Sequence, residues 1–136
     1  MSKLITENDL KAIFDAILPS DQVDYVIEQG VDNNWHYKKY SSGEFDAWIS
    51  FESNVACDTA SGSLYKSADQ TLNLPSFILT NSLNSWVING SANGFESIWF
   101  LTFDTSNRLV KYNLVRTSSR TAASRNVKMT LQGRWK

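Results

Sequence analysis

Residues 34–51 read NWHYKKYSSGEFDAWISF, and this stretch decides the fold class of the chain. Trp35 to Tyr40 and Glu44 to Phe51 each alternate between two kinds of side chain, which predicts two antiparallel strands. The loop between them has three residues and ends in Gly43. Such a loop predicts a type I turn followed by a bulge, where the glycine takes the left-handed conformation.

The two faces of this hairpin differ in character. With Tyr40 opposite Glu44, one face collects the side chains expected in the core, which are Trp35, Tyr37, Phe45, Ala47, Ile49 and Phe51. The other face is polar and aromatic and holds His36, Lys38, Tyr40, Glu44, Asp46 and Trp48. A slip of one residue would bury Lys38 and Asp46, so the register is well specified. The framework expected from the hairpin is therefore Trp35, Tyr37, Gly43, Ile49 and Phe51.

Short alternating segments continue on both sides of the hairpin. Further strands are expected at residues 22–28, 64–68, 77–80, 85–88, 95–103, 108–116 and 126–135. The apolar segment 95–103 is expected to be a central strand, 89–94 and 104–107 to be turns, and 53–62 and 117–124 to be loops. About eight short strands joined in this way predict an all-β, antiparallel β-sandwich or jelly-roll-like head over residues 22–136.

The N-terminal segment 1–21 has a different period. Thr6 can cap a helix that runs to about Leu18, and Pro19 ends it. Its apolar stripe, at helical spacing, consists of Leu10, Ile13, Phe14 and Ile17. The stripe packs either on its own domain or around the axis of an oligomer, and the sequence leaves both open.

Composition narrows the class of protein. A chain of 136 residues is one domain, and five Trp, seven Phe and five Tyr suit β-structure and surfaces that bind by stacking. Residues 1–58 hold eleven acidic and four basic side chains, net −7, whereas residues 59–136 hold three and nine, net +6. No basic run interleaves with aromatics, so we expect no nucleic-acid partner. The single cysteine forms no intramolecular disulfide.

Residues for catalysis are few. His36 and Cys57 are the only histidine and thiol, and nothing in the sequence near Cys57 lowers its pKa, so we favour structural roles. Glu44 and Asp46 share a strand face about 6.6–6.8 Å apart. That spacing suits a glycosidase pair, but solvated strand positions explain it more simply. No metal-ligand pattern or phosphate loop is present. We therefore expect a protein that is not an enzyme, with no cofactor and no metal.

The remaining interpretation is that the protein binds a ligand without catalysing a reaction. Aromatic rings and planar polar side chains bind sugars, and six such residues lie at expected strand ends and turns: Trp86, Asn89, Asn93, Asp104, Asn107 and Arg108. Each tryptophan has core or interface packing as its alternative. Arg116, Arg120 and Arg125 bracket the second loop, and they either bind an acidic glycan or are simply solvated. We favour solvation.

Three segments carry a resemblance to a known family. Residues 23–30 read VDYVIEQG, residues 34–48 read NWHYKKYSSGEFDAW, and the chain ends GRWK. They resemble the C-terminal domain of phage tail, baseplate or fibre proteins, with the pattern EQG…W-x-Y-x-K-W-x-x-G-x-x-E-x-W, short strands and then GRWK. Tyr40 stands where that pattern has Trp, and Asp46 and Ala47 stand where Glu and Cys are common. All three residues are compatible with the hairpin.

The resemblance implies a function. Such proteins are typically homotrimers that recognise host-surface polysaccharide, so we expect a non-catalytic phage virion protein that binds carbohydrate. The alternative is a virion assembly or capsid decoration protein, such as a head fibre, that binds other virion proteins. No binding residue is carried over from the family. With no signal-peptide pattern and no apolar stretch of 18 residues, we expect synthesis in the bacterial cytoplasm, no membrane insertion and a place in the virion.

Overall fold

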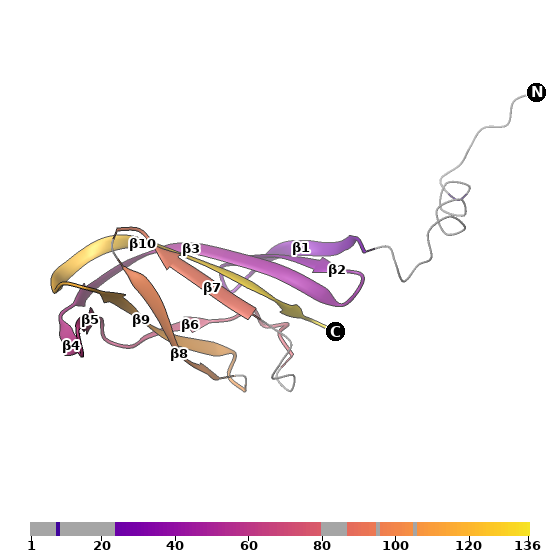
Figure 1. The fold of residues 1–136 in the computed structure, drawn as a ribbon. Helices are drawn as coiled ribbons and strands as arrows, with labels where there is room; N and C mark the ends of the chain where they lie inside the picture. Colours follow the sequence, from indigo (N-terminus) through magenta and orange to yellow (C-terminus); the bar gives the residue numbers. More distant parts are fainter. Residues whose placement is uncertain (1–7, 9–23, 80–86, 95, 105) are drawn as a thin grey trace, which may run out of the picture.

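The computed structural model describes residues 8, 24–79, 87–94, 96–104 and 106–136 (Figure 1). These residues form antiparallel β-structure with ten strands: β1 (Val26–Asp32), β2 (Trp35–Tyr40), β3 (Glu44–Cys57), β4 (Thr59–Ser61), β5 (Leu64–Lys66), β6 (Gln70–Asn73), β7 (Val87–Ala92), β8 (Ser97–Asp104), β9 (Leu109–Arg116) and β10 (Arg120–Arg134). The expected all-β class is therefore confirmed. Apart from Asn8, which is helical, the expected N-terminal helix lies outside the described residues.

The first sheet has the strand order β1-β2-β3-β10-β7. Its centre is the long pairing of β3 with β10, which runs from Cys57 opposite Arg120 to Glu44 opposite Arg134. The β2–β3 hairpin has the predicted register, with His36 opposite Trp48. Alternation along β3 therefore turns every second side chain toward the core and the others toward solvent.

Gly43 closes that hairpin. Its φ is +95°, a conformation that glycine adopts without steric cost, and its N–H donates to the Tyr40 carbonyl at 3.0 Å. A Cβ at this position would lie 2.8 Å from Nη2 of Arg134 and 3.2 Å from the Lys136 carbonyl. The turn thus needs glycine both for its backbone and for its contact with the C-terminal end of the chain.

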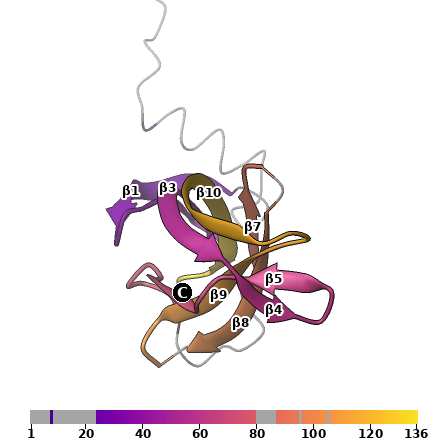
Figure 2. The ribbon, with the colours of Figure 1, turned by 90° about the vertical axis from the view of Figure 1, so that its left-hand side faces the viewer.

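The second sheet contains β4, β5, β6, β8 and β9. β9 pairs with β5 and β6 and also with β8, and β4 extends the sheet beyond β5. Figures 1 and 2 both place this sheet beneath the first. Among the described residues β8 pairs with β9 alone, so β8 lies at an edge.

One hydrophobic core lies between the two sheets. It consists mainly of Phe45, Ala47 and Ile49 from β3, Val127, Met129 and Leu131 from β10, and Val110, Tyr112 and Leu114 from β9, with Trp35 and Cys57. Trp35 is fully buried, and its indole N–H donates to the Asn73 carbonyl at 2.8 Å. Of the other hairpin framework residues, Ile49 is buried, while Tyr37 and Phe51 are half-buried against this core.

Several expected boundaries are wrong. The loop expected at 53–62 is instead the end of β3 followed by β4, because Ser53 and Asn54 pair with Arg125 and Ser124 of β10. The loop expected at 117–124 is shortened in the same way, since β10 begins at Arg120. Small polar residues thus continue the hydrogen-bonded pairing of β3 with β10, although their own sequence is typical of a loop.

The middle of the chain also differs from expectation. Gln70–Asn73 forms strand β6, while the expected strand at 77–80 begins as a turn around Phe77. The turn expected at 89–94 is reduced to Asn93 and Gly94, because residues 89–92 belong to β7. The segment expected as a central strand is the edge strand β8, whose Trp99, Leu101 and Phe103 are 40–44% exposed. An apolar run does not distinguish a buried strand from an edge strand with two apolar faces.

Candidate functional site

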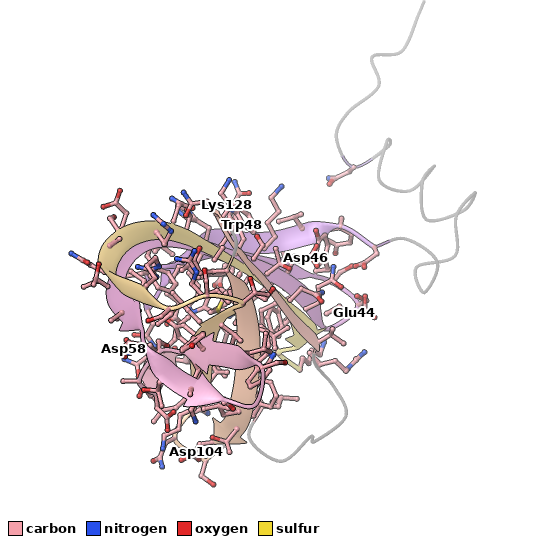
Figure 3. All side chains as sticks on the ribbon, turned by 60° about the vertical axis from the view of Figure 1, so that its left-hand side comes forward. Glu44, Asp46, Trp48, Asp58, Asp104 and Lys128 are labelled. Atoms are coloured by element: carbon pink, nitrogen blue, oxygen red, sulfur yellow. The ribbon has the colours of Figure 1, made fainter. Side chains whose placement is uncertain are left out.

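The solvent-facing side of the first sheet carries a strip of polar and aromatic side chains, hereafter the outer face. Cross-strand pairing sets two neighbouring rows across it, which are Val31–His36–Trp48–Thr130–Asn89 and Gln29–Lys38–Asp46–Gln132–Val87. Figure 3 places Glu44, Asp46, Trp48 and Lys128 on this side of the molecule, away from Asp104. The rows combine side chains from β1, β2, β3, β10 and β7.

Trp48 is the central side chain of the outer face. It points outward because its neighbours Ala47 and Ile49 point into the core, and it is 41% exposed. The ring of His36, directly across the β2–β3 pair, stacks on it with centroids 5.8 Å apart and an interplanar angle of 15°. The two stacked rings, hereafter the platform, therefore stand parallel to each other on this face, and water reaches the indole of Trp48.

A shallow hollow adjoins this platform. It encloses about 380 Å³ and is lined by Gln29, Gly30, Val31, His36, Tyr37, Lys38 and Trp48. A second hollow on the same sheet, of about 320 Å³, is lined by Ser91, Ala92, Asn93, Asn126 and Lys128. Both contain ammonium or amide donors and amide acceptors, which bind hydroxyl groups.

Asp46 is held in place beside the platform. The Tyr40 hydroxyl donates to its carboxylate at 2.8 Å, and Lys38 lies opposite it in the β2–β3 register. That hydrogen bond raises the pKa of Tyr40 above its ordinary value, with a further contribution from burial. Tyr40 and Lys38 thus hold the Asp46 carboxylate in one position, where it can accept a hydrogen bond from a ligand.

The predicted sugar-binding residues do not form one site. Asn89 lies on the outer face, in the row of Trp48, whereas Asn93 lies between β7 and the first end of β8, and Asp104 is the last residue of β8. Over the eight residues of β8 these ends are separated by roughly 25 Å. Trp86 lies outside the described residues, as do Leu10, Ile13, Phe14 and Ile17.

Three of these residues stabilise turns, and a fourth fixes a strand. Asp104 accepts hydrogen bonds from the backbone and the side-chain amide of Asn107, at 3.0 and 2.8 Å, which lower the pKa of Asp104. Arg108 has a φ of +53° and donates to the Ile78 carbonyl at 3.0 Å. The side-chain oxygen of Asn93 accepts from the backbone N–H of Asn126 at 2.8 Å.

A second polar cluster lies at the end of the core farthest from Gly43. Arg116, Arg120 and Arg125 surround Glu96, whose side chain is fully buried. The three arginine side chains are only 14%, 7% and 29% exposed, so the favoured interpretation of these arginines as solvated is wrong. Sequence reasoning identified the arginines but not their carboxylate, which precedes them by 20 or more residues.

Cys57 borders this cluster. Its thiol is buried, donates to the Leu114 carbonyl at 3.5 Å and accepts from Arg120 at 3.6 Å. Burial raises the pKa of the thiol, and the positive charge of Arg120 offsets part of that rise. His36, the other expected candidate for catalysis, lies on the outer face, whereas Cys57 belongs to the core, so the two do not form a nucleophilic pair.

Comparison with protein-family models, with curated proteins and with solved structures found no match to this chain. Within the described residues, no helix is long and apolar enough to cross a membrane. The same residues contain no group of three or more His, Cys, Asp or Glu side chains that could hold a metal ion.

Proposed function

We propose that this chain is the non-catalytic head of a phage tail or fibre protein and binds host-surface carbohydrate through its outer face. In this proposal residues 22–136 form a β-sandwich head that assembles as a homotrimer in the virion. The segment 1–21 serves as its attachment or trimerisation helix. The observation that carries the proposal is the exposed ring of Trp48, stacked on His36 among polar side chains.

Proteins recognise sugars through flat apolar surfaces with polar groups around them. The C–H faces of a pyranose ring pack on flat aromatic surfaces, while its hydroxyls need donors and acceptors in the surrounding plane. Trp48 and His36 offer flat surfaces through the ring faces that are not stacked against each other. Lys38, Asp46 and Gln29 offer an ammonium group, a carboxylate and an amide in the adjoining row. An open, shallow face of this kind accommodates a chain of sugars better than a single small molecule.

Strand β8 favours the second candidate function, binding to other virion proteins. Its side chains Trp99 and Leu101 are apolar and 40% and 41% exposed, and among the described residues the strand lies at the edge of its sheet. Exposed apolar strips and unpaired strand edges are both typical of protein–protein interfaces. The two surfaces belong to different sheets, so separate substitutions distinguish the two functions.

The experiment is a binding assay with purified bacterial surface polysaccharides on a glycan array. The proposal expects binding by the wild type and, for Trp48→Ala, a loss of about 0.5–1.5 kcal/mol per site, or roughly twofold to tenfold in affinity. Trp99→Ala is the matched control, since it removes an equally exposed indole from the other sheet. No binding to any surface polysaccharide, or equal losses in the two variants, would reject the outer face as the sugar site.

Oligomeric state is tested separately. Light scattering at micromolar concentration is expected to give the mass of a trimer. A trimer that depends on Trp99 and does not bind polysaccharide would support the assembly function instead.

A further inference from the structure

The cluster around Glu96 joins strands β9 and β10 to the start of β8 at one end of the core. Arg120 donates from Nε to Oε1 of Glu96 at 2.6 Å, and Arg125 donates from Nε to both carboxylate oxygens at 3.2 Å. Nη1 of Arg116 lies 3.7 Å from Oε1. Arg116 is the last residue of β9, Arg120 and Arg125 are the first and sixth residues of β10, and Glu96 directly precedes β8.

The charges in this cluster do not balance. Three guanidinium groups, which stay protonated at all ordinary pH values, face the single carboxylate of Glu96. Within the described part of the chain no other carboxylate lies within 4.0 Å of the charged nitrogens of these arginines. Two positive charges are therefore in excess in a site that is mostly removed from water. Buried charges in proteins are normally paired, so this excess is costly.

The cluster also contains a hydrogen-bond donor that has no acceptor. Nε of Arg116 is buried and has no acceptor. Arg120, in contrast, uses its other nitrogens on the Thr121 and Ala123 carbonyls and on Cys57. Arg116 and Arg125 are the more exposed of the three side chains, so the cluster opens to solvent beside them.

The backbone approaches the cluster closely at Gly94. Its φ is +80°, and a Cβ there would lie 2.9 Å from Oε2 of Glu96 and 3.3 Å from Nε of Arg125. A side chain at this position would displace the carboxylate. Gly94 therefore leaves Glu96 and Arg125 in place and adds no side chain of its own over them.

We propose that Arg116 and Arg125 bind a small oxyanion, a carboxylate or phosphate group, which neutralises the excess charge beside Glu96. Guanidinium groups bind both anions through paired, charge-assisted hydrogen bonds. The oxyanion accepts from the part of the Arg116 guanidinium that reaches solvent and from the exposed edge of Arg125. Because Nε of Arg116 is buried, contact with that atom requires the guanidinium to turn toward the ion. It is either a free ion or an acidic substituent of a larger molecule.

This inference does not rest on the proposed carbohydrate function. Arg125 lies opposite Ser53, which is five residues from Trp48 on β3, or about 17 Å along the strand, and on the opposite face of the sheet, so the cluster and the outer face are distinct. A neutral glycan could bind at Trp48 with no anion at Arg116. An anion could equally bind at Arg116 in a protein that binds no sugar.

The test uses the full chain with three probes, which are inorganic phosphate, D-glucuronate and, as the uncharged control, D-glucose. Each is added at about 10 mM, with sodium chloride adjusted to constant ionic strength, because surface charges respond to salt alone. The expected result is a shift of the Arg116 Nε–Hε resonance and a higher Tm with phosphate or glucuronate, but not with glucose. Phosphate alone would identify a phosphoryl ligand, and glucuronate alone a carboxylate.

The second part of the test measures how substitutions change the binding of the anion. Arg116→Gln and Arg125→Gln are each expected to weaken binding of the active probe at least tenfold by calorimetry. Arg134→Gln is the matched control, since this exposed arginine donates to the Ser42 carbonyl at the far end of β10. The proposal fails if neither anion shifts the Arg116 resonance of the wild type, or if Arg134→Gln weakens binding as much as Arg116→Gln. The resonance measurement needs no variant, so it remains decisive if a substitution prevents folding.

Discussion

Replacement of Glu96 by glutamine is expected to be among the most destabilising polar substitutions in this chain. The carboxylate is fully buried and is the common acceptor of Arg120 at 2.6 Å and Arg125 at 3.2 Å. Removing one partner of a buried ion pair leaves an uncompensated charge and costs about 3–5 kcal/mol. The pair of Glu96 with Arg120 is buried in this sense, while Arg125 and Arg116 keep partial contact with water. We therefore expect a loss of about 4 kcal/mol in the free energy of unfolding.

Urea unfolding followed by circular dichroism measures this loss. With a slope of about 1.5 kcal/mol per molar urea, a loss of about 4 kcal/mol lowers the midpoint by roughly 2.5 M. Glu28→Gln is the matched control, because Glu28 pairs with Lys39 at 2.8 Å on the exposed strand β1 and should change the midpoint far less. Equal effects of the two substitutions would refute the claim that Glu96 is a buried, charge-paired centre.

Three further predictions concern the core, the thiol and pH. Leu131→Ala should cost about 2–5 kcal/mol by urea unfolding, whereas Val31→Ala, at a position 61% exposed, should stay within about 0.5 kcal/mol. Because Cys57 is buried and its thiol pKa is raised, a thiol reagent at neutral pH should leave the native protein unmodified and should label one thiol after unfolding in urea. The hydrogen bond from Lys39 lowers the pKa of Glu28, so the stability that Glu28 adds is present above its ordinary pKa and is lost as pH falls through the lowered value. Between about pH 6 and about pH 3 the urea midpoint should consequently fall more for the wild type than for Glu28→Gln, and equal falls would contradict that coupling.

The hairpin was predictable because its determinants are local. A three-residue turn with Gly43 and strict alternation on both sides fix which residue faces which, and His36 faces Trp48 as expected. The same reasoning identified a polar and aromatic face. It did not add Gln29 to that face, because it missed the two-residue turn Asn33-Asn34, whose φ values of +49° and +69° suit a tight hairpin between β1 and β2.

The longer-range features were not predictable in this way. Ser53 and Asn54 look like loop residues in sequence but are strand residues, because residues about 70 positions later pair with them. Glu96 is an ordinary surface residue type, and only the fold brings it to Arg116, Arg120 and Arg125. Propensity and period describe neighbours along the chain, whereas these contacts depend on which strands become adjacent.

The most direct test of the carbohydrate proposal is a titration of ¹⁵N-labelled protein with the polysaccharide that binds best on the array, observed at the tryptophan indole N–H resonances. The account predicts that the indole of Trp48 shifts, together with the backbone amides of His36 and Thr130 on either side of it. The fully buried indole of Trp35 is the internal control and should not move. A polysaccharide that binds but shifts only Trp99, and leaves Trp48 unchanged, would contradict the account.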